Sequence, residues 1–389
     1  MEELGVAVVG FGWMGRVHTR AYARLPHHHP RLPLRPRLIA VAEEVPGRVG
    51  EAAEQFGFAT ATGDWREVAA DPRVRAVCVT APNFLHRRIG VAMAEAGKHL
   101  WIEKPVGLSA EDARAVADAA AQAGVQGTVG FHYRNAPAVE RARALIAAGE
   151  IGTVTHVRIR LFSDYAAHPD SALTWRYERA RGGSGVLGEL ASHGADLARF
   201  LLGDMTAVIA DTAVFVSERA RPPGATAGRP LGGGERGPVE NEDRGTVENE
   251  DYVGCLLRFA SGARGVLEAC RVSVGERNAY GFEVHGTSGA VFWDFRRMNE
   301  LAVGRGAAVQ DQPVCTVHVG PGDGEFAAFQ PGAANATGYD DLLVIEAHRF
   351  LRSIAEGTPY GATLADAVRG AVVLDAMAES AASGNRVEL

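Results

Sequence analysis

The sequence predicts a two-domain α/β protein, with a first domain built on a parallel sheet and a second, α+β domain with a large, open, mostly antiparallel sheet. Over the first 129 residues, short apolar runs alternate with segments of helical periodicity, which is typical of a parallel sheet covered by helices on both faces. After residue 130, strand-like segments follow one another with fewer helices between them, as in antiparallel sheets. We therefore expect domains at residues 1–129 and 130–389.

The first domain contains short apolar runs of the kind that form buried parallel strands, at residues 4–9, 38–42, 76–80, 99–102 and 126–130. Helices are expected after Gly12 and at residues 48–56, 65–70, 86–96 and 110–123. The run His27-His28-His29 lies in a proline-rich connection, with no cysteine or acidic residue close to it in sequence. We expect this run to be a solvent-exposed loop, and we expect no metal site.

The second domain is expected to have helices at residues 136–148 and 184–202 and strands at 153–161, 207–216, 252–259, 263–274 and 280–286. An alanine- and leucine-rich helix at residues 364–382 is expected to pack in the core or between domains. Residues 217–251 are rich in Gly, Pro, Arg and Glu and contain Val-Glu-Asn-Glu-Asp twice, at 239–243 and 247–251. We expect this stretch to be a flexible, solvated insertion.

Composition excludes several classes of protein. The chain has 389 residues, 40 basic and 47 acidic, with a net charge of −7, and this mildly acidic balance disfavours nucleic-acid or anionic-membrane partners. No apolar run approaches the roughly 18 residues of a membrane span, and the acidic start Met1-Glu2-Glu3 lacks the basic region of a signal peptide. The four cysteines are scattered, as expected for reduced thiols in a cytoplasmic protein.

Glycines at the end of the first strand predict a phosphate-binding turn. Gly10, Gly12 and Gly15 form G-x-G-x-x-G between an apolar strand and a helix, which is the context of the Rossmann dinucleotide-binding fingerprint. Glu43, next to Glu44, follows the second strand and is expected to accept a hydrogen bond from the adenosine ribose. Two acids there would repel a 2′-phosphate, so we expect NAD rather than NADP.

Three residues are candidates for catalysis. Lys104 lies in Glu103-Lys104-Pro105 at the carboxyl end of a predicted parallel strand, where it could stabilise a substrate oxygen as hydride leaves carbon. Glu189 and His193 are four residues apart and would share one face of a helix. His193 could then exchange the alcohol proton, although the roles of Lys104 and His193 could be interchanged, while Glu189 could orient the imidazole or bind a sugar hydroxyl.

Together these motifs resemble the glucose–fructose oxidoreductase, inositol dehydrogenase and rhizopine-catabolism family, Gfo/Idh/MocA. The matching stretches are Val8 to Gly15, Thr80-Ala81-Pro82-Asn83 with His86, Gly97 to Pro105, and Gly183 to His193. The resemblance implies a Rossmann domain, a second domain whose open sheet mediates a homodimer or homotetramer, and a cis Lys104–Pro105 bond. It implies cofactor contacts by Gly10, Phe11, Gly12, Trp13, Met14, Gly15, Glu43, Thr80, Pro82, Asn83, His86, Glu103 and Lys104.

The family's E-K-P lysine corresponds to Lys104, and its D-x-x-x-H motif corresponds to Glu189 and His193. This chain departs from the family at Glu189, where Asp is usual; Glu keeps the charge and adds one methylene. Three further stretches, residues 130–137, 164–177 and 182–185, most resemble the branch of sugar and cyclitol dehydrogenases that includes levoglucosan dehydrogenase. Aromatic rings suit the C–H faces of a polyol and guanidinium groups its hydroxyls, so the expected substrate contacts are Tyr133, Arg134, Asp164, Trp175 and Arg176.

The resemblance implies an NAD(P)-dependent dehydrogenase, with NAD preferred, that acts on a secondary hydroxyl of a sugar, anhydrosugar or cyclitol. Two alternatives remain open. Some enzymes on this scaffold cleave glycosides through transient NAD-dependent oxidation. The superfamily also includes a non-catalytic NAD-binding regulator, although Lys104 and His193 are both retained here.

Overall fold

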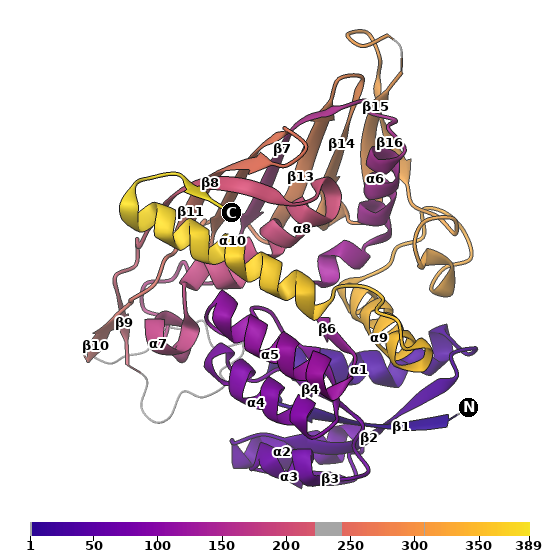
Figure 1. The fold of residues 1–389 in the computed structure, drawn as a ribbon, viewed down its shortest axis with the longest axis vertical. Coiled ribbons are helices and arrows are strands. Elements are labelled where there is room, and N and C mark those ends of the chain that lie inside the picture. The colour runs from indigo at the N-terminus through magenta and orange to yellow at the C-terminus, as the bar shows by residue number, and fades with distance from the viewer. Residues whose placement is uncertain (1, 222–242, 307) are drawn as a thin grey trace.

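The computed structural model describes residues 2–221, 243–306 and 308–389 (Figure 1). The first domain is a six-stranded parallel sheet in the order β3-β2-β1-β4-β5-β6, which confirms the predicted Rossmann arrangement. Its strands are β1 (Glu2–Val9), β2 (Leu34–Ala42), β3 (Thr60–Thr62), β4 (Ala76–Val79), β5 (His99–Ile102) and β6 (Gly127–Val129). Its helices are α1 (Trp13–His28), α2 (Pro46–Phe56), α3 (Trp65–Ala70), α4 (Asn83–Glu95) and α5 (Ala110–Ala123).

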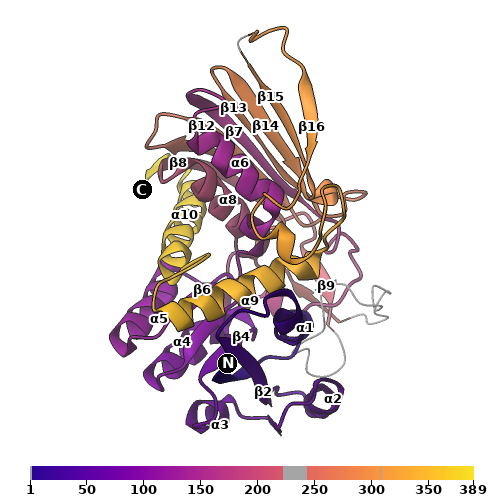
Figure 2. The same cartoon turned by 90° about the vertical axis from the view of Figure 1, so that its right-hand side faces the viewer.

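The second sheet is a mixed sheet in the order β16-β15-β14-β13-β7-β12-β11-β8-β17, in which only β12 and β7 pair in parallel. Its strands are β7 (Val154–Phe162), β8 (Met205–Ala213), β11 (Tyr252–Phe259), β12 (Arg264–Cys270), β13 (Ala279–Gly286), β14 (Gly289–Asp294), β15 (Glu300–Arg305), β16 (Val314–His318) and β17 (Val387–Glu388). The sequence did not predict β14, β15 and β16. Helices α6 (Pro137–Ala147) and α8 (Ser192–Leu202) cover one face of this sheet (Figures 1 and 2).

The last two helices return to the first domain. Helix α9 (Tyr339–Glu356) packs along α1, and α10 (Leu364–Ser383) lies against α5, β6 and β8 (Figure 2). The Trp101 Nε1 atom donates to a buried Glu346 carboxylate oxygen at 3.1 Å, which joins β5 to α9. The expected boundary near residue 130 therefore follows the end of β6, but the C-terminal helices cover the Rossmann sheet.

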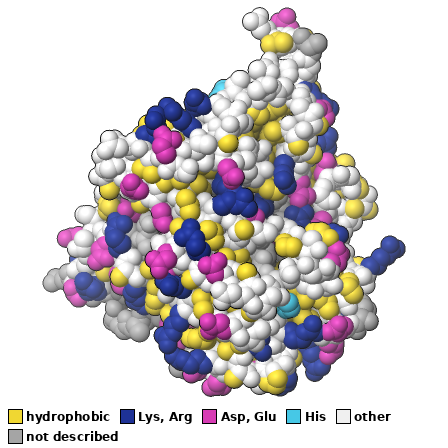
Figure 3. All heavy atoms as spheres, in the orientation of Figure 1, with side chains coloured by type: hydrophobic (Ala, Val, Ile, Leu, Met, Phe, Trp, Pro, Cys, Tyr) yellow, Lys and Arg dark blue, Asp and Glu magenta, His cyan; other side chains and the backbone are white. Residues whose placement is uncertain are grey.

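Alternation along β1 explains the two-sided packing. Leu4, Val6 and Val8 belong to the apolar cluster that includes α1 and α9, whereas Ala7 and Val9 belong to the cluster that includes α4 and α5. Parallel strands buried on both faces are apolar at nearly every position, which is the pattern of this strand. No helix in the described ranges is long and apolar enough to cross a membrane. On the face shown in Figure 3, acidic and basic side chains are interspersed.

The expectation of a solvated insertion over residues 217–251 is wrong for its two ends. Strands β9 (Glu218–Ala220) and β10 (Arg244–Thr246) pair with each other, and Asn249 and Asp251 are fully buried. The first copy of the repeat lies almost entirely outside the described residues. Burial of the second copy was hidden by its polar composition, because its partners come from distant parts of the chain.

The expectation of a solvent-exposed loop at His27–His29 is wrong for the backbone and for His28 and His29, although His27 is exposed. Helix α1 continues to His28, and the ring of His29 stacks on that of His348 with centroids 3.7 Å apart. Glu325 lies beside both rings, so the acidic neighbour that the local sequence lacks is supplied by tertiary structure. We assign no metal to these three residues. The rings of His29 and His348 are only 10° from parallel, so the in-plane lone pairs of their nitrogens cannot both point at one ion. Glu325 in turn already accepts a hydrogen bond from Arg349 at 2.8 Å.

Candidate active site

A large cleft runs along the carboxyl ends of the Rossmann strands and is closed on its other side by the second domain. This is the edge at which open α/β sheets bind ligands. Of the predicted site residues, Gly15 and Arg134 do not line the cleft. Those that do are Gly10, Phe11, Gly12, Trp13, Met14, Glu43, Thr80, Pro82, Asn83, His86, Glu103, Lys104, Tyr133, Asp164, Trp175, Arg176, Glu189 and His193.

The glycine turn has the geometry of a dinucleotide phosphate site. Gly10 has a φ of 89°, and a Cβ there would lie 2.6 Å from the backbone nitrogen of Ala81, so only glycine fits. Gly12 caps α1 without a side-chain hydrogen bond, and the space beside its Cα is open. The N–H groups of the first turn of α1 can therefore face a pyrophosphate, which fits the residues to NAD.

Glu43 braces this turn. One carboxylate oxygen accepts the backbone N–H of Phe11 at 2.7 Å, and the other accepts that of Val45 at 3.1 Å. Each oxygen keeps a second lone pair for a ribose hydroxyl. Arg48 lies 3.7 Å from the same carboxylate, so an acid and a cation stand together where the ribose is expected.

The segment from Thr80 to His86 also lines the cleft. The Thr80 hydroxyl donates to the Gly10 carbonyl, and Asn83 donates to the Gly182 carbonyl at 3.4 Å. Both ring nitrogens of His86 lie 2.7 Å from backbone carbonyls, those of Pro105 and Ala81. His86 therefore fixes the turn after the cis Lys104–Pro105 bond, and its ring nitrogens already have protein partners.

Lys104 and His193 come from different domains and both line the cleft. The Nζ atom of Lys104 donates to the backbone carbonyl of Glu189 at 2.7 Å. Burial lowers the pKa of Lys104, although Glu103 and Glu189 oppose that shift. Burial, the Lys104 cation and His132 hold the pKa of His193 well below its usual range. A neutral, buried imidazole thus lies near a half-buried amine, an arrangement suited to acid–base chemistry on an alcohol.

The expected helix at residues 184–202 begins with a π-helical turn, Leu187–Ala191, before α8. Such turns are frequent at functional sites. Within it, the Glu189 side chain accepts from the Tyr165 hydroxyl and lies 3.4 Å from the Arg271 guanidinium and 3.6 Å from that of Arg176. No hydrogen bond joins Glu189 to His193 in the described structure, so its suggested role in orienting the imidazole is not supported.

Of the expected substrate contacts, Arg176 lies beside Glu189. The Arg176 guanidinium lies 4.4 Å above the ring of Trp175, which is 5% exposed, and both residues line the cleft. Asp164 forms an ion pair at 3.6 Å with the largely exposed Arg277. Tyr133 lies deeper, with its ring 4.6 Å from that of His193.

The expectation for Arg134 is corrected by the structure. Its guanidinium is buried and donates to Asp196 at 2.9 Å and to Asp366 at 3.3 Å. It also lies 5.0 Å above the ring of Phe200. Arg134 therefore joins the helices of the second domain instead of contacting substrate.

Sequence reasoning missed several residues of the cleft, of which His132 is the most informative. His132 is 3% exposed, and neither ring nitrogen has a hydrogen-bond partner of normal geometry in the described structure. Its ring lies 5.1 Å from that of His193 and 5.0 Å from that of Tyr339, and burial lowers its pKa to about 4. His132 could have been found from the sequence because it is adjacent to Tyr133, an expected substrate contact. Tyr165, Arg277, Tyr280 and Tyr339 also line the cleft.

Comparison with known proteins agrees with this geometry. Residues 4–131 match the family described as an oxidoreductase family with an NAD-binding Rossmann fold, and residues 139–292 match the GFO/IDH/MocA C-terminal domain. Levoglucosan dehydrogenase of Pseudarthrobacter phenanthrenivorans is 38% identical, over 100% of this chain and 99% of that protein. Inositol 2-dehydrogenase of Rhizobium meliloti is 26% identical over 98% of each chain. A structure of levoglucosan dehydrogenase with NADH and L-sorbose superposes with a TM-score of 0.91 at 36% identity, over 100% of this chain and 99% of that one.

Proposed function

This chain belongs to the GFO/IDH/MocA family of NAD-binding oxidoreductases, and on that premise we propose that it oxidises a secondary hydroxyl of a sugar, anhydrosugar or cyclitol. One observation carries the proposal: Lys104 and His193 lie in the same cleft as the glycine turn. An acid–base pair at that place can act on a substrate carbon that lies beside the nicotinamide.

The residues suggest how the oxidation proceeds. NAD, when bound, supplies the hydride acceptor. The proton of the substrate hydroxyl passes to the neutral imidazole of His193. The carbon that bears this hydroxyl loses its hydrogen as hydride and becomes a carbonyl carbon. The Lys104 ammonium stabilises the negative charge that develops on the oxygen. His193 is buried and Lys104 is half-buried, and this low exposure to solvent strengthens the electrostatic effect.

The polar lining supports a neutral polyol as substrate. Near Lys104 and His193 the cleft offers both carboxylates and guanidinium groups, with Asp164 and Glu189 facing Arg176 and Arg277. Carboxylates accept hydrogen bonds from sugar hydroxyls and guanidinium groups donate to them. Because the charges are mixed, the lining does not select an anionic or cationic substrate.

The test is turnover with NAD on a panel of levoglucosan, other anhydrosugars, pyranoses and inositols, followed by the absorbance of NADH. We expect at least one of these compounds to be oxidised. Absence of turnover with every polyol and its ketone, in both directions and with both cofactors, would overturn the proposal. Cleavage of a chromogenic glycoside without net NADH would favour the glycoside-cleaving alternative. Intact cellular function after Lys104→Ala would favour the regulatory one.

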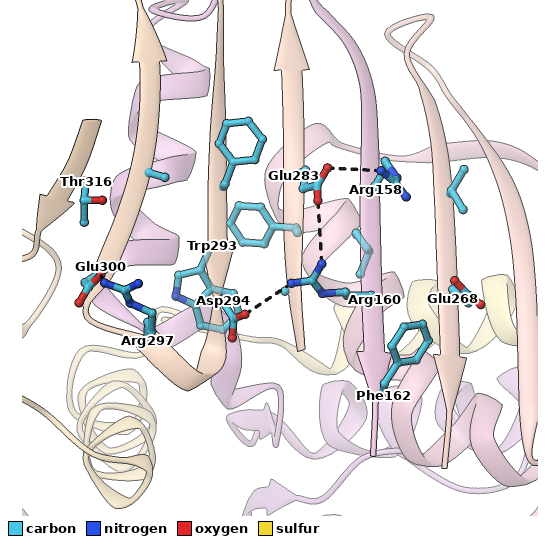
Figure 4. A pocket seen from close by; sticks show the side chains of 16 residues that line it. Arg158, Arg160, Phe162, Glu268, Glu283, Trp293, Asp294, Arg297, Glu300 and Thr316 are labelled. Atoms are coloured by element: carbon cyan, nitrogen blue, oxygen red, sulfur yellow. Dashed lines mark hydrogen bonds and ion pairs between the residues drawn. The ribbon is translucent and has the colours of Figure 1, made fainter. Parts of the chain in front are cut away.

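We further propose that the outer face of the second sheet joins copies of this chain into a homodimer or homotetramer. Ile209, Leu256 and Val266 are direct cross-strand neighbours on β8, β11 and β12, and they are 42%, 56% and 40% exposed. Beyond them Arg158 and Arg160 pair with Glu283 and Asp294 (Figure 4). We expect Leu256→Glu to give a monomer by light scattering with the cofactor site intact. A monomeric parent protein, or an unchanged mass for the variant, would contradict this interface.

We also propose a cytoplasmic location. All four cysteines are unpaired in the structure, and unpaired thiols are typical of reducing compartments. Cell fractionation tests this location, and recovery outside the cytosolic fraction would contradict it.

A further inference from the structure

The second copy of the repeated motif, residues 247–251, is part of the frame of the active site. Asn249 is fully buried, and its side-chain nitrogen donates to the carbonyls of Arg176 at 2.7 Å and Gly183 at 2.9 Å. The backbone carbonyl of Glu250 accepts the N–H of Val186 at 2.9 Å. The repeat thus holds both the segment that carries Arg176 and the turn that leads to Glu189.

Arg271, at the end of β12, connects this frame to Glu189. It is fully buried, and its Nε atom donates to the equally buried Asp251 at 2.8 Å. One terminal nitrogen donates to the Asn249 side-chain oxygen at 2.9 Å and to the Asn249 backbone carbonyl at 3.2 Å. Because a guanidinium is planar, these partners fix the direction of its other terminal nitrogen, which lies 3.4 Å from Glu189 Oε2.

The two oxygens of Glu189 therefore have different surroundings. Oε2 receives the Tyr165 hydroxyl and Arg271, whereas the partner of Oε1 is Arg176 Nε, at 3.6 Å. Glu189 and Arg176 both line the cleft. Oε1 keeps free lone pairs there for a substrate hydroxyl.

We propose that Arg271 is a positioning residue that acts through Glu189, holding that carboxylate so that Oε1 accepts a hydrogen bond from a sugar hydroxyl, and that Asn249 and Asp251 of the repeat hold Arg271. This inference rests on the proposed function. It gives the second copy of the repeat a role in sugar affinity.

The experiment is a double-mutant cycle with Glu189→Gln and Arg271→Met, read as KM for levoglucosan or the best polyol, kcat, and the NADH dissociation constant by tryptophan fluorescence. We expect Arg271→Met to raise KM roughly 10- to 100-fold with a much smaller change in kcat, because a contact that is equal in ground and transition states is lost. NADH affinity should stay within about twofold. In the Glu189→Gln background, the same substitution should change KM less than about threefold.

Two milder variants keep the test informative if Arg271→Met fails to fold. Arg271→Lys retains the positive charge but loses the planar guanidinium group. Asn249→Ser removes one partner of Arg271 and retains the other, Asp251. Both variants should raise KM for the polyol and leave NADH affinity unchanged. The matched control is Asn335→Ser, which should leave KM unchanged, because the exposed Asn335 donates to the Gly332 carbonyl and does not line the cleft. A purely structural role predicts a lower melting temperature and a smaller active fraction with KM unchanged.

The outcomes separate this inference from the proposed function. Suppose that the parent protein turns over a polyol. If the effects of Glu189→Gln and Arg271→Met on KM then simply multiply in the double variant, the inference is overturned and the proposed function stands. The same conclusion follows if the folded Arg271 and Asn249 variants keep the parent KM. If the parent protein turns over no polyol, the proposed function falls and takes this inference with it.

Discussion

The Nζ atom of Lys104 lies 2.7 Å from the backbone carbonyl oxygen of Glu189, so the lysine after β5 is anchored by a π-helical turn of the second domain. This contact is to the main chain, and the Glu189 carboxylate is held separately by Tyr165 and Arg271. The position of the cation and that of the carboxylate are therefore set by different partners. Substitution of the Glu189 side chain should leave the anchor of Lys104 in place.

Lys104→Met should lower kcat/KM for polyol oxidation by about 10²- to 10⁴-fold, because the charge that develops on the oxygen loses its cation. NADH should bind the variant within a few-fold of the parent affinity, as measured by fluorescence titration. Lys98→Met is a control, since Lys98 donates to the Asp71 and Val74 carbonyls away from the cleft. A Lys104→Met enzyme that keeps more than about a tenth of the activity would contradict the assigned role.

The pH profile of oxidation should report the neutral state of His193. Burial and the Lys104 cation hold its pKa well below the ordinary histidine value of 6.5, so the base form persists on acidification to below that pH. We expect kcat/KM to stay level from pH 8 down past 6.5 and to fall only at lower pH, with stability checked at each point. An acid limb centred at or above 6.5 would show that His193 is not a buried base.

Glu43→Ala should shift the cofactor preference toward NADP by about tenfold, in the ratio of kcat/KM values for the two cofactors. The substitution removes a carboxylate that would repel a 2′-phosphate and frees Arg48, now 3.7 Å away, to attract one. Glu44→Ala, at the exposed neighbouring acid, is the control and should shift the ratio less. An unchanged ratio for Glu43→Ala would mean that this acid does not face the ribose.

Arg134→Leu should lower the free energy of unfolding by about 3–5 kcal/mol, because it leaves the buried Asp196 without its cation. Denaturant unfolding measures this loss. In the folded fraction, KM for the polyol should change less than about threefold, whereas Arg176→Leu should raise it. A large KM effect of Arg134→Leu at unchanged stability would restore Arg134 as a substrate contact.

Local patterns predicted the parts of this protein that depend on neighbours in sequence. The strand–glycine–helix order gave the Rossmann turn, and an apolar strand ending at Glu103-Lys104 placed the lysine at the ligand edge of the sheet. Strands β14 to β16 were not predicted. For β16 the reason is that the strand lies at the edge of the sheet and Val314 is 60% exposed, so its apolar pattern is weak.

The site residues that depend on long-range partners could not be read in the same way. Arg134 and Arg176 look alike in sequence, yet Arg134 donates to acids on α8 and α10, whereas Arg176 lines the cleft. Asn249 and Asp251 of the second copy hold Arg271, a contact that the sequence of the repeat does not reveal. The sequence gives the charge of a side chain. Its interaction partner depends on which distant segment the tertiary fold places next to it.

By itself, the sequence determined the fold class and the dinucleotide turn, and it predicted Lys104 and His193 as the catalytic pair. Backbone geometry needs glycine at fixed spacings, and the chemistry needs those side chains at element ends. Only the tertiary structure decided that the carboxylate of Glu189 belongs with Arg271 and not with His193, and that His29 meets Glu325. Buried polar groups require partners, and folding takes those partners from wherever packing places them.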